Sequence, residues 1–479
     1  MLEISEKLFE RWNKEGIVYC HWKSNEHLKE GLNGLTDLDV LLSDSDKIRG
    51  EQSLRELDFL QCKSQYGSCY PYVNDWIGFD HQTGSIIHLH LHYRIVTGHK
   101  GMKEYTLPWT NEVLQTRLKS NDTGVYMTNP TLELLTLYTR IGLKADLYSL
   151  IKAKLGRFKL NSDVKIEVDY LKPLVDWGEL LEWISKFYGD GADQFFKLIQ
   201  KEQIDSRTFL QIVSLSQEAM YKYRRVNHIR LKEVYYTFKV KFRSYLKKKG
   251  WNLITRKVPI TGNGLIVAFI GQDGAGKSTV TEEIRKWLTW KLDARRFYLG
   301  SGDHYHSWQK LILNFFPKHG LTMPIHAFLR LSMYTTLAKD VSKTVRNARC
   351  YAEKGGIALF DRYPQTIFHG INDGPKIREK IPNNKLLRSL FLRFADREEF
   401  LLRQAEKITP DIVFKLLLPP EESIRRKPQE DLEYVKMKHE IIKQLQFPHS
   451  KVIMIDATQD YQQELIMIKR VIWDSIPKL

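Results

Sequence analysis

The sequence has little cysteine and no long hydrophobic run. No apolar stretch approaches the ~18 residues of a membrane-spanning helix, since the run at 311–316 stops at Pro317 and Lys318. The first residues lack the apolar segment of a secretory signal, so we expect a cytoplasmic protein. The four cysteines form no CxxC pair, which favours free thiols over a disulfide framework.

Acidic residues are outnumbered by basic ones, 57 to 74, and the formal net charge is +17. Such a charge favours a polyanionic partner. The excess is uneven, because residues 222–257 hold thirteen basic residues and one acidic residue, or +12 of the total. Aromatic residues alternate with these cations. The segment is either an amphipathic connector or a contact surface for nucleic acid or an anionic membrane.

The chain length and the residue pattern predict several domains. At roughly 150 residues per domain, 479 residues suggest about three units. Strand and helix signals mix over 1–125, which predicts an α+β domain. Helical patterns over 126–250 predict an extension that includes the basic connector. Strands and helices alternate over 258–479, which predicts an α/β domain with a parallel sheet.

A glycine loop between a predicted strand and a predicted helix is the clearest motif. Residues 271–279 read GQDGAGKST and match GxxxxGK[ST]. Glycines let successive backbone N–H groups point at phosphate oxygens, and the helix that follows offers its positive dipole end. We expect Lys277 to neutralise ATP phosphates and Ser278 to bind Mg²⁺. The expected ATP-binding residues are Gly271, Gly274, Gly276, Lys277, Ser278 and Thr279.

Two later elements complete the predicted phosphate site. An apolar strand at 356–360 ends in Asp361 and Arg362, where open α/β sheets bind ligands. Asp361 is expected to act on Mg²⁺, and Arg362 to orient the phosphate acceptor. Arg425 and Arg426 follow another apolar strand and are expected to stabilise the transferring phosphoryl group. Alternatively, Asp361 is a turn residue and the two arginines belong to a solvated helix face.

Residues 264–479 resemble the thymidylate kinase-like branch of the nucleoside monophosphate kinases. The shared motifs are Asp-Gly-Ala-Gly-Lys-Ser at 273–278, Asp-Arg-Tyr at 361–363, Pro-Asp at 410–411 and an arginine-bearing lid. The resemblance implies a five-stranded parallel sheet with helices on both faces, and ATP and Mg²⁺ as cofactors. It also implies a contact between Asp273 and a hydroxyl group of the acceptor's sugar.

The chain departs from that family after the Asp-Arg-Tyr motif. It continues with PQTIFHG at 364–370 and lacks the segment that helps to read thymine. The acceptor could therefore be another nucleotide, a nucleoside, a sugar or a glycan end.

An acidic pair marks the N-terminal region. Asp37 and Asp39 stand two residues apart on an apolar strand, so both side chains face the same side. Two such carboxylates can hold a divalent metal for attack on a nucleotide phosphate. The spacing from Ser24 resembles the nucleotidyltransferase fold, in which a small pair precedes Asp-h-Asp-h. Residues 91–94 also resemble a stretch of an uncharacterised nucleotidyltransferase family with helical extensions.

The resemblance would place a third acid where the chain has His90. His88, His90 and His92 alternate, so all three face one side of a strand. Imidazole ligates transition metals, which makes Asp37, Asp39 and His90 candidate metal ligands. Three hypotheses stay open: an active transferase, an altered site without catalysis, and a dedicated metal site.

The combined hypothesis is an ATP-dependent phosphotransferase fused to a nucleotidyltransferase-like domain. One alternative moves the main chemistry to Asp37 and Asp39, as transfer of a nucleoside monophosphate to a small molecule, a protein or RNA. Another is a nucleotide-switched protein that binds nucleic acid or a membrane through its basic segment.

Overall fold

The computed structural model describes residues 1–62, 70–99, 101–226, single positions between 231 and 242, 260–299, 323–371, 373–383 and 385–477. The chain divides into two compact units, Met1–Arg256 and Lys257–Leu479. Most of the basic segment at 222–257 lies outside the described residues, as do Cys69 and the apolar run at 311–316.

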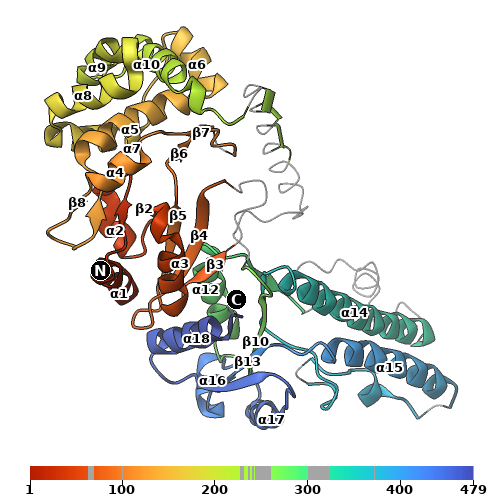
Figure 1. Cartoon of the computed structure of the whole chain (residues 1–479). Coiled ribbons are helices and arrows are strands. Elements are labelled where there is room, and N and C mark those ends of the chain that lie inside the picture. Colours follow the sequence, from red (N-terminus) through yellow and green to blue (C-terminus); the bar gives the residue numbers. More distant parts are fainter. Residues whose placement is uncertain are drawn as a thin grey trace. The chain divides into compact units, whose positions relative to one another are not determined.

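A seven-stranded mixed sheet forms the centre of the first unit (Figure 1). Its strand order is β3-β4-β5-β2-β1-β9-β8, and β2 pairs with β5 in parallel. Strands β4 and β5 form an antiparallel hairpin. The strands of this unit are β1 (Tyr19–His21), β2 (Leu38–Leu42), β3 (Leu60–Cys62), β4 (Val73–Phe79), β5 (Ile86–His92), β6 (Val96–Thr97), β7 (Tyr105–Thr106), β8 (Leu118–Lys119) and β9 (Tyr126–Met127).

Helices accompany this sheet and then form a bundle of their own. The early helices are α1 (Glu3–Lys14), α2 (Leu28–Leu32), α3 (Lys47–Glu56) and α4 (Thr110–Gln115). The bundle contains α5 (Pro130–Leu143), α6 (Leu147–Lys154), α7 (Ser162–Leu171), α8 (Trp177–Tyr188), α9 (Ala192–Gln200) and α10 (Ser206–Ala219). Short 3₁₀ turns are η1 (Asn25–His27), η2 (Asp44–Asp46), η3 (Lys172–Leu174), η4 (Gly189–Gly191) and η5 (Tyr221–Tyr223).

The bundle and the sheet share one hydrophobic core. Trp22 and Leu41 from the sheet region belong to the same buried cluster as Leu135 and Tyr138 of α5. The N-terminus of α5 is capped by Asn129, whose side chain accepts a hydrogen bond from the Thr131 backbone N–H. The hydroxyl group of the preceding residue, Thr128, donates to the backbone carbonyl of His21 at 3.4 Å.

The second unit is built on a five-stranded sheet in the order β11-β12-β10-β13-β14. Every neighbouring pair is parallel, which confirms the expected parallel sheet. The central strand is buried from Leu265 to Ile270, as strands covered on both faces require. The strands are β10 (Leu265–Gly271), β11 (Ala294–Phe297), β12 (Ile357–Phe360), β13 (Ile412–Leu417) and β14 (Lys451–Asp456).

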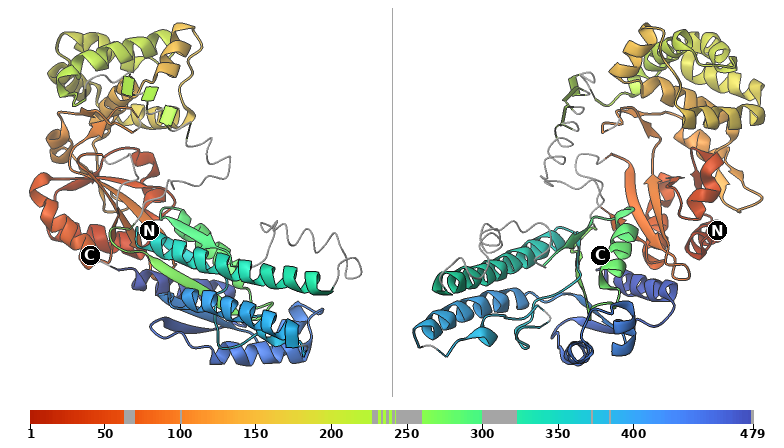
Figure 2. Two further views of the ribbon diagram at one scale, coloured as in Figure 1. Left: turned by 90° about the vertical axis from the view of Figure 1, so that its right-hand side faces the viewer. Right: turned by 180° about the vertical axis from the view of Figure 1, so that it is seen from behind.

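Helices cover both faces of this second sheet, as expected. Figures 1 and 2 show α14 and α15 side by side on one side, with α12 and α18 on the other. The helices are α12 (Lys277–Thr289), α14 (Met323–Ala352), α15 (Lys385–Glu406), α16 (Pro420–Arg426), α17 (Leu432–Gln444) and α18 (Tyr461–Ser475), with a 3₁₀ turn η6 (Arg378–Lys380).

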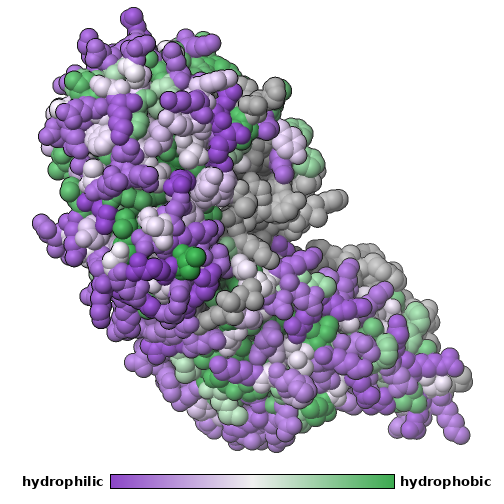
Figure 3. Space-filling view, in the orientation of Figure 1, coloured by the Kyte–Doolittle hydropathy of each residue, from purple (hydrophilic) through white to green (hydrophobic). Residues whose placement is uncertain are grey.

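The visible surface of each unit is mainly hydrophilic, with apolar residues scattered across it (Figure 3). Among the residues that the structure describes, no helix combines the length and apolar character needed to cross a bilayer.

Candidate functional sites

The glycine loop lies between β10 and α12, as the sequence predicted. Gly274 and Gly276 have φ angles of +83° and +84°, a region that favours glycine. A Cβ atom on Gly271 would lie 2.6 Å from the Leu416 carbonyl oxygen of β13. The loop therefore depends on glycine for two reasons, its backbone conformation and its close approach to a neighbouring strand.

Lys277 begins α12 with its amine held inside the loop. The Nζ atom donates to the carbonyl oxygens of Gly271 and Gln272, each at 2.8 Å. Burial lowers the pKa of this lysine to about 8. The backbone of its own loop therefore positions the amine, with no carboxylate in these hydrogen bonds.

Asp361 lies directly after β12 and is almost completely buried. One carboxylate oxygen, Oδ2, accepts a hydrogen bond from Arg296 of β11, a residue that the sequence analysis did not select. The other oxygen, Oδ1, is buried and has no hydrogen-bond partner among the described residues. An unpaired buried carboxylate oxygen is costly unless a cation or donor joins it, which fits the expected metal role. Ser278 lies in the first turn of α12 with an exposed side chain.

Arg362 lines a pocket beside α14 and α15. Its Nη1 atom lies 3.5 Å from Asp373 Oδ1, and burial raises the pKa of Asp373. The Glu398 carboxylate anchors the adjacent segment by accepting from the backbone N–H groups of Lys376 and Ile377. The pocket is lined by Leu299, Tyr334, Leu337, Ala338, Val341, Arg362, Pro364, Asp373, Gly374, Lys376, Glu398 and Leu402.

The two predicted lid arginines differ in position. Arg426 directs its guanidinium toward the carbonyl oxygens of Gly274 and Ala457, at 3.4 and 3.3 Å. The Arg425 side chain is 78% exposed and pairs with Glu422. The structure therefore brings Arg426, but not Arg425, against the glycine loop.

Asp273, the predicted acceptor contact, is paired with a lysine from α17. Its Oδ2 atom lies 2.6 Å from the Nζ atom of Lys438. Burial alone would raise the pKa of Asp273, but the hydrogen bond from Lys438 and the charge of Lys277 lower it. Asp273 is therefore held in its ionised form beside the loop.

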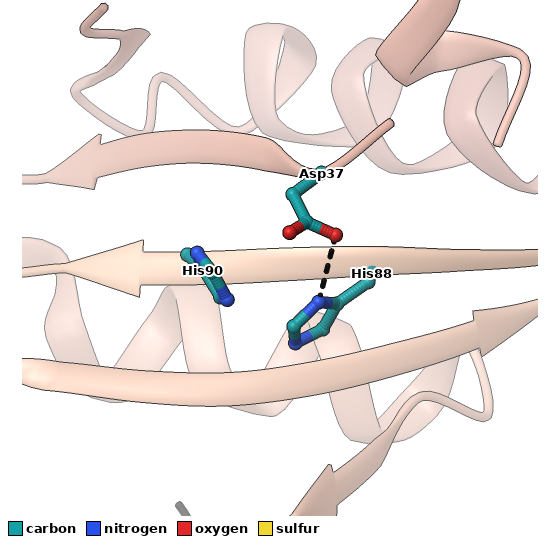
Figure 4. A group of neighbouring side chains, drawn as sticks. All are labelled: Asp37, His88 and His90. Atoms are coloured by element: carbon teal, nitrogen blue, oxygen red, sulfur yellow. Dashed lines mark hydrogen bonds and ion pairs between the residues drawn. The ribbon is translucent and has the colours of Figure 1, made fainter. Parts of the chain in front are cut away.

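The first unit brings the N-terminal candidate residues together. In the β2–β5 pair Asp39 lies opposite His90, and the His90 Nδ1 atom is 3.5 Å from Asp39 Oδ1. The His88 Nδ1 atom lies 3.0 Å from Asp37 Oδ1. Figure 4 shows His88 and His90 projecting from one strand, with Asp37 facing His88 from the position just before β2. The predicted one-sided arrangement of acids and histidines is confirmed.

A third carboxylate, which the sequence analysis missed, belongs to this group. Asp75 of β4 lies opposite His90 in the hairpin. Its Oδ1 atom is 3.2 Å from the Nε2 atoms of both His88 and His90. Burial alone would lower the pKa of His88, but hydrogen bonds with Asp37 and Asp75 raise it. Burial lowers the pKa of His92 to about 3, so this ring is neutral.

Cationic side chains gather beside the same carboxylates. Lys23 Nζ lies 2.8 Å from Asp39 Oδ2; burial favours a raised Asp39 pKa, but Lys23, His90 and His92 bring it well below its usual value. Lys103 has a φ angle of +41°, and burial lowers its pKa to about 8. The charge of Arg140 lowers the pKa of Lys144. The site therefore combines carboxylates with cations from both the sheet and the helical bundle.

Ser24, the predicted small residue, introduces a polar link between sheet and bundle. It has a φ angle of +55°, and its hydroxyl group donates to Glu167 of α7 at 3.4 Å. The next residue, Asn25, donates to Glu133 of α5 through its backbone and its side chain. Burial raises the pKa of Glu133 to about 8. One oxygen of each of Glu26, Glu133 and Glu167 lies within 4.8 Å of the others.

Comparison with curated proteins finds similarity to two Escherichia coli K12 proteins. The chain is 26% identical over 222 residues to YghR, named an uncharacterized ATP-binding protein; the alignment covers 43% of this chain and 86% of YghR. It is 24% identical over 212 residues to YghS, which has the same description, with 40% and 85% covered. No family model matches the chain.

Solved structures give matches with low TM-scores. A deoxyadenosine kinase from M. mycoides with bound dCMP and dCDP is 18% identical with a TM-score of 0.28, covering 43% of this chain and 98% of that chain. A structure of APE1195 is 16% identical with a TM-score of 0.22, covering 44% and 96%. Scores this low carry no conclusion about function.

Proposed function

We propose that the second unit binds ATP and transfers its γ-phosphoryl group to a small acceptor. The observation that carries this proposal is the glycine loop between β10 and α12, with the Lys277 amine held inside it by two backbone carbonyls. Backbone N–H groups, a helix N-terminus and a lysine are the parts that phosphate binding requires. YghR and YghS are named ATP-binding proteins, which supports ATP as the nucleotide in this proposal.

Positioning and electrostatics supply the chemistry in this proposal, because phosphoryl transfer needs little covalent participation by the protein. Lys277 turns from the loop carbonyls to the phosphates, and Arg426 stabilises charge that spreads over the transferring group. Ser278 and Asp361 would hold Mg²⁺, which neutralises phosphate charge when bound. Asp273 accepts a hydrogen bond from a hydroxyl group of the substrate that receives the phosphoryl group, once Lys438 has moved away from its carboxylate.

The pocket at Arg362 is the proposed acceptor site. Arg362 and Lys376 provide positive charge, while Asp373 and Glu398 provide hydrogen-bond acceptors. This mixture suits a polar acceptor that carries hydroxyl groups or a phosphate, such as a nucleotide, a nucleoside or a sugar.

An ATP-coupled screen of nucleosides, nucleotides and sugars tests the proposal. We expect phosphorylation of at least one of these acceptors by the full chain and loss of it in Lys277→Ala. Product formation should persist in Asp39→Asn, which leaves the glycine loop intact. Unchanged turnover in Lys277→Ala would refute the assignment of this site.

A second candidate function is nucleotidyl transfer by the first unit. The Lys23 ammonium group, 2.8 Å from Asp39, favours it, since a triphosphate needs positive charge and a metal-binding acid pair together. Incubation with α-labelled nucleoside triphosphates tests this function. We expect label transfer to a small molecule, protein or RNA, and its loss in Asp39→Asn but not in Lys277→Ala.

A further inference from the structure

The carboxylates and histidines at β2, β4 and β5 offer both oxygen and nitrogen ligands, a combination that suits Mg²⁺ poorly. One oxygen of Asp37 and one ring nitrogen of each of His88 and His90 lie within 4.8 Å of one another. Mg²⁺ prefers an octahedral shell of oxygen atoms, whereas imidazole nitrogen suits zinc, iron, nickel and copper. Two histidines and a carboxylate on adjacent strands therefore point away from an Mg²⁺ site.

Asp75 holds the two imidazole rings in the arrangement that metal ligation requires. Its Oδ1 atom is 3.2 Å from the Nε2 atoms of both His88 and His90. A histidine that binds a metal through one nitrogen usually donates its other N–H to a carboxylate, which fixes the tautomer. With Nε2–H directed at Asp75, the Nδ1 lone pairs face the side of β2 that carries Asp37 and Asp39.

Two of the three candidate ligands are partly open to solvent, whereas the His88 side chain is 4% exposed. The side chains of Asp37 and His90 are 31% and 28% exposed, so a cation can enter without unfolding the sheet. Asp39 is different, because Lys23 lies 2.8 Å from it and already supplies a positive charge. The view in Figure 4 places Asp37, His88 and His90 around a common side of the β2–β5 pair.

We propose that Asp37, His88 and His90 bind a divalent transition metal, with Asp75 as the positioning residue for both imidazoles. Ligands of a tetrahedral zinc ion at about 2.1 Å lie about 3.4 Å apart. Side chains within 4.8 Å of one another reach that spacing by small rotamer adjustments. Three protein ligands leave one position of a tetrahedral ion, which a water molecule or a phosphate oxygen can take. The inference is independent of the kinase proposed for the second unit.

Cobalt titration of the metal-stripped full chain tests the site. We expect the chain to bind one Co²⁺ ion that shows visible d–d absorption. This absorption should persist when Mg²⁺ is added in excess, because Mg²⁺ occupies only the sites that have oxygen ligands alone. His90→Gln should lose this ion and its absorption. Asp75→Asn should weaken binding by about tenfold to hundredfold and alter the tautomers seen by ¹⁵N-histidine NMR, a change that loss of stability alone would not cause.

The matched control is His81→Gln, which changes an exposed histidine in the turn between β4 and β5 and should leave Co²⁺ binding unchanged. Thermal melting of each metal-free variant checks that His90→Gln and Asp75→Asn still fold. Displacement of Co²⁺ by Mg²⁺, or an unchanged spectrum in His90→Gln, would overturn the proposal. So would NMR evidence that His88 stays a protonated imidazolium between Asp37 and Asp75 in the presence of saturating Co²⁺.

Discussion

The two candidate sites of this chain are assembled in opposite ways. The glycine loop spans nine consecutive residues at 271–279, and its lysine is positioned by carbonyl oxygens of that same loop. The N-terminal site collects residues from Lys23 to Lys144, on three strands, several loops and a helix. A contiguous site depends on local backbone geometry, whereas a dispersed site depends on strand register and on the surrounding fold.

The strongest test of this difference is a charge removal at Lys277. Lys277→Ala should reduce phosphoryl transfer by at least about 10²–10³-fold, because the loop loses the one side chain that neutralises phosphate. Lys277→Arg should not restore activity, since a planar guanidinium does not fit the carbonyl positions of the compact ammonium group. Steady-state kinetics measure both effects. Nearly normal kcat in either variant would contradict the local character of this site.

Substitution of a loop glycine should destabilise the second unit. In Gly271→Ala the new Cβ would meet the Leu416 carbonyl at 2.6 Å, which should cost about 3 kcal/mol through forced backbone movement. Gly276→Ala is the matched control, because its Cβ meets nothing within 4 Å and only the positive φ costs about 1 kcal/mol. Calorimetric unfolding measures the two losses. Equal losses would show that the contact with β13 is unimportant.

Loss of the Glu133 proton should make the first unit less stable as the pH rises. Its pKa is about 8 in the folded chain and ordinarily 4.5, so the folded state binds more protons between these values. The free energy of unfolding should therefore fall as pH rises from about 5 to 8, by up to about 1.4 kcal/mol per pH unit. Glu133→Gln should remove this component, as denaturant titrations across pH can show. A slope that persists unchanged in the variant would exclude Glu133 as its source.

The smallest expected effects concern the KM for ATP in variants of the two neighbouring arginines of α16. Arg426→Ala should raise the KM for ATP about tenfold, the loss of one charge-assisted contact. Arg425→Ala should change it less than about twofold, because this side chain is exposed and pairs with Glu422 at the surface. Kinetics with varied ATP compare the pair directly. A larger effect at Arg425 would mean that α16 moves when nucleotide binds.

The sequence predicts a site best where the residues of that site follow one another along the chain. The strand, loop and helix around 271–279 could be predicted because a buried apolar run, a glycine pattern and a helical face follow one another directly. The β4–β5 hairpin was predictable too, and its antiparallel register could have placed Asp75 opposite His90 once the turn was located. Asp75 belongs to no local motif, and only its pairing with His90 across the hairpin brings it to the site.

Other site residues could not be found from spacing alone. Three such residues contact the second unit's site from elements far apart in the sequence: Arg296 of β11, Asp373 of a turn after β12, and Lys438 of α17. Arg425 and Arg426 differ in position for a related reason. Adjacent residues on a helix point about 100° apart, so one faces the loop and the other faces solvent.

The shared core of the first unit determines how this chain can be divided. Trp22 and Leu41 pack in one cluster with Leu135 and Tyr138, and Asn25 is hydrogen-bonded to Glu133. A fragment that ended near residue 125 would lose its apolar cover and leave Asn25 without its buried partner. The helical bundle is therefore inseparable from the sheet that precedes it. In evolutionary terms, we expect the sheet and the bundle of the first unit to be inherited as one module.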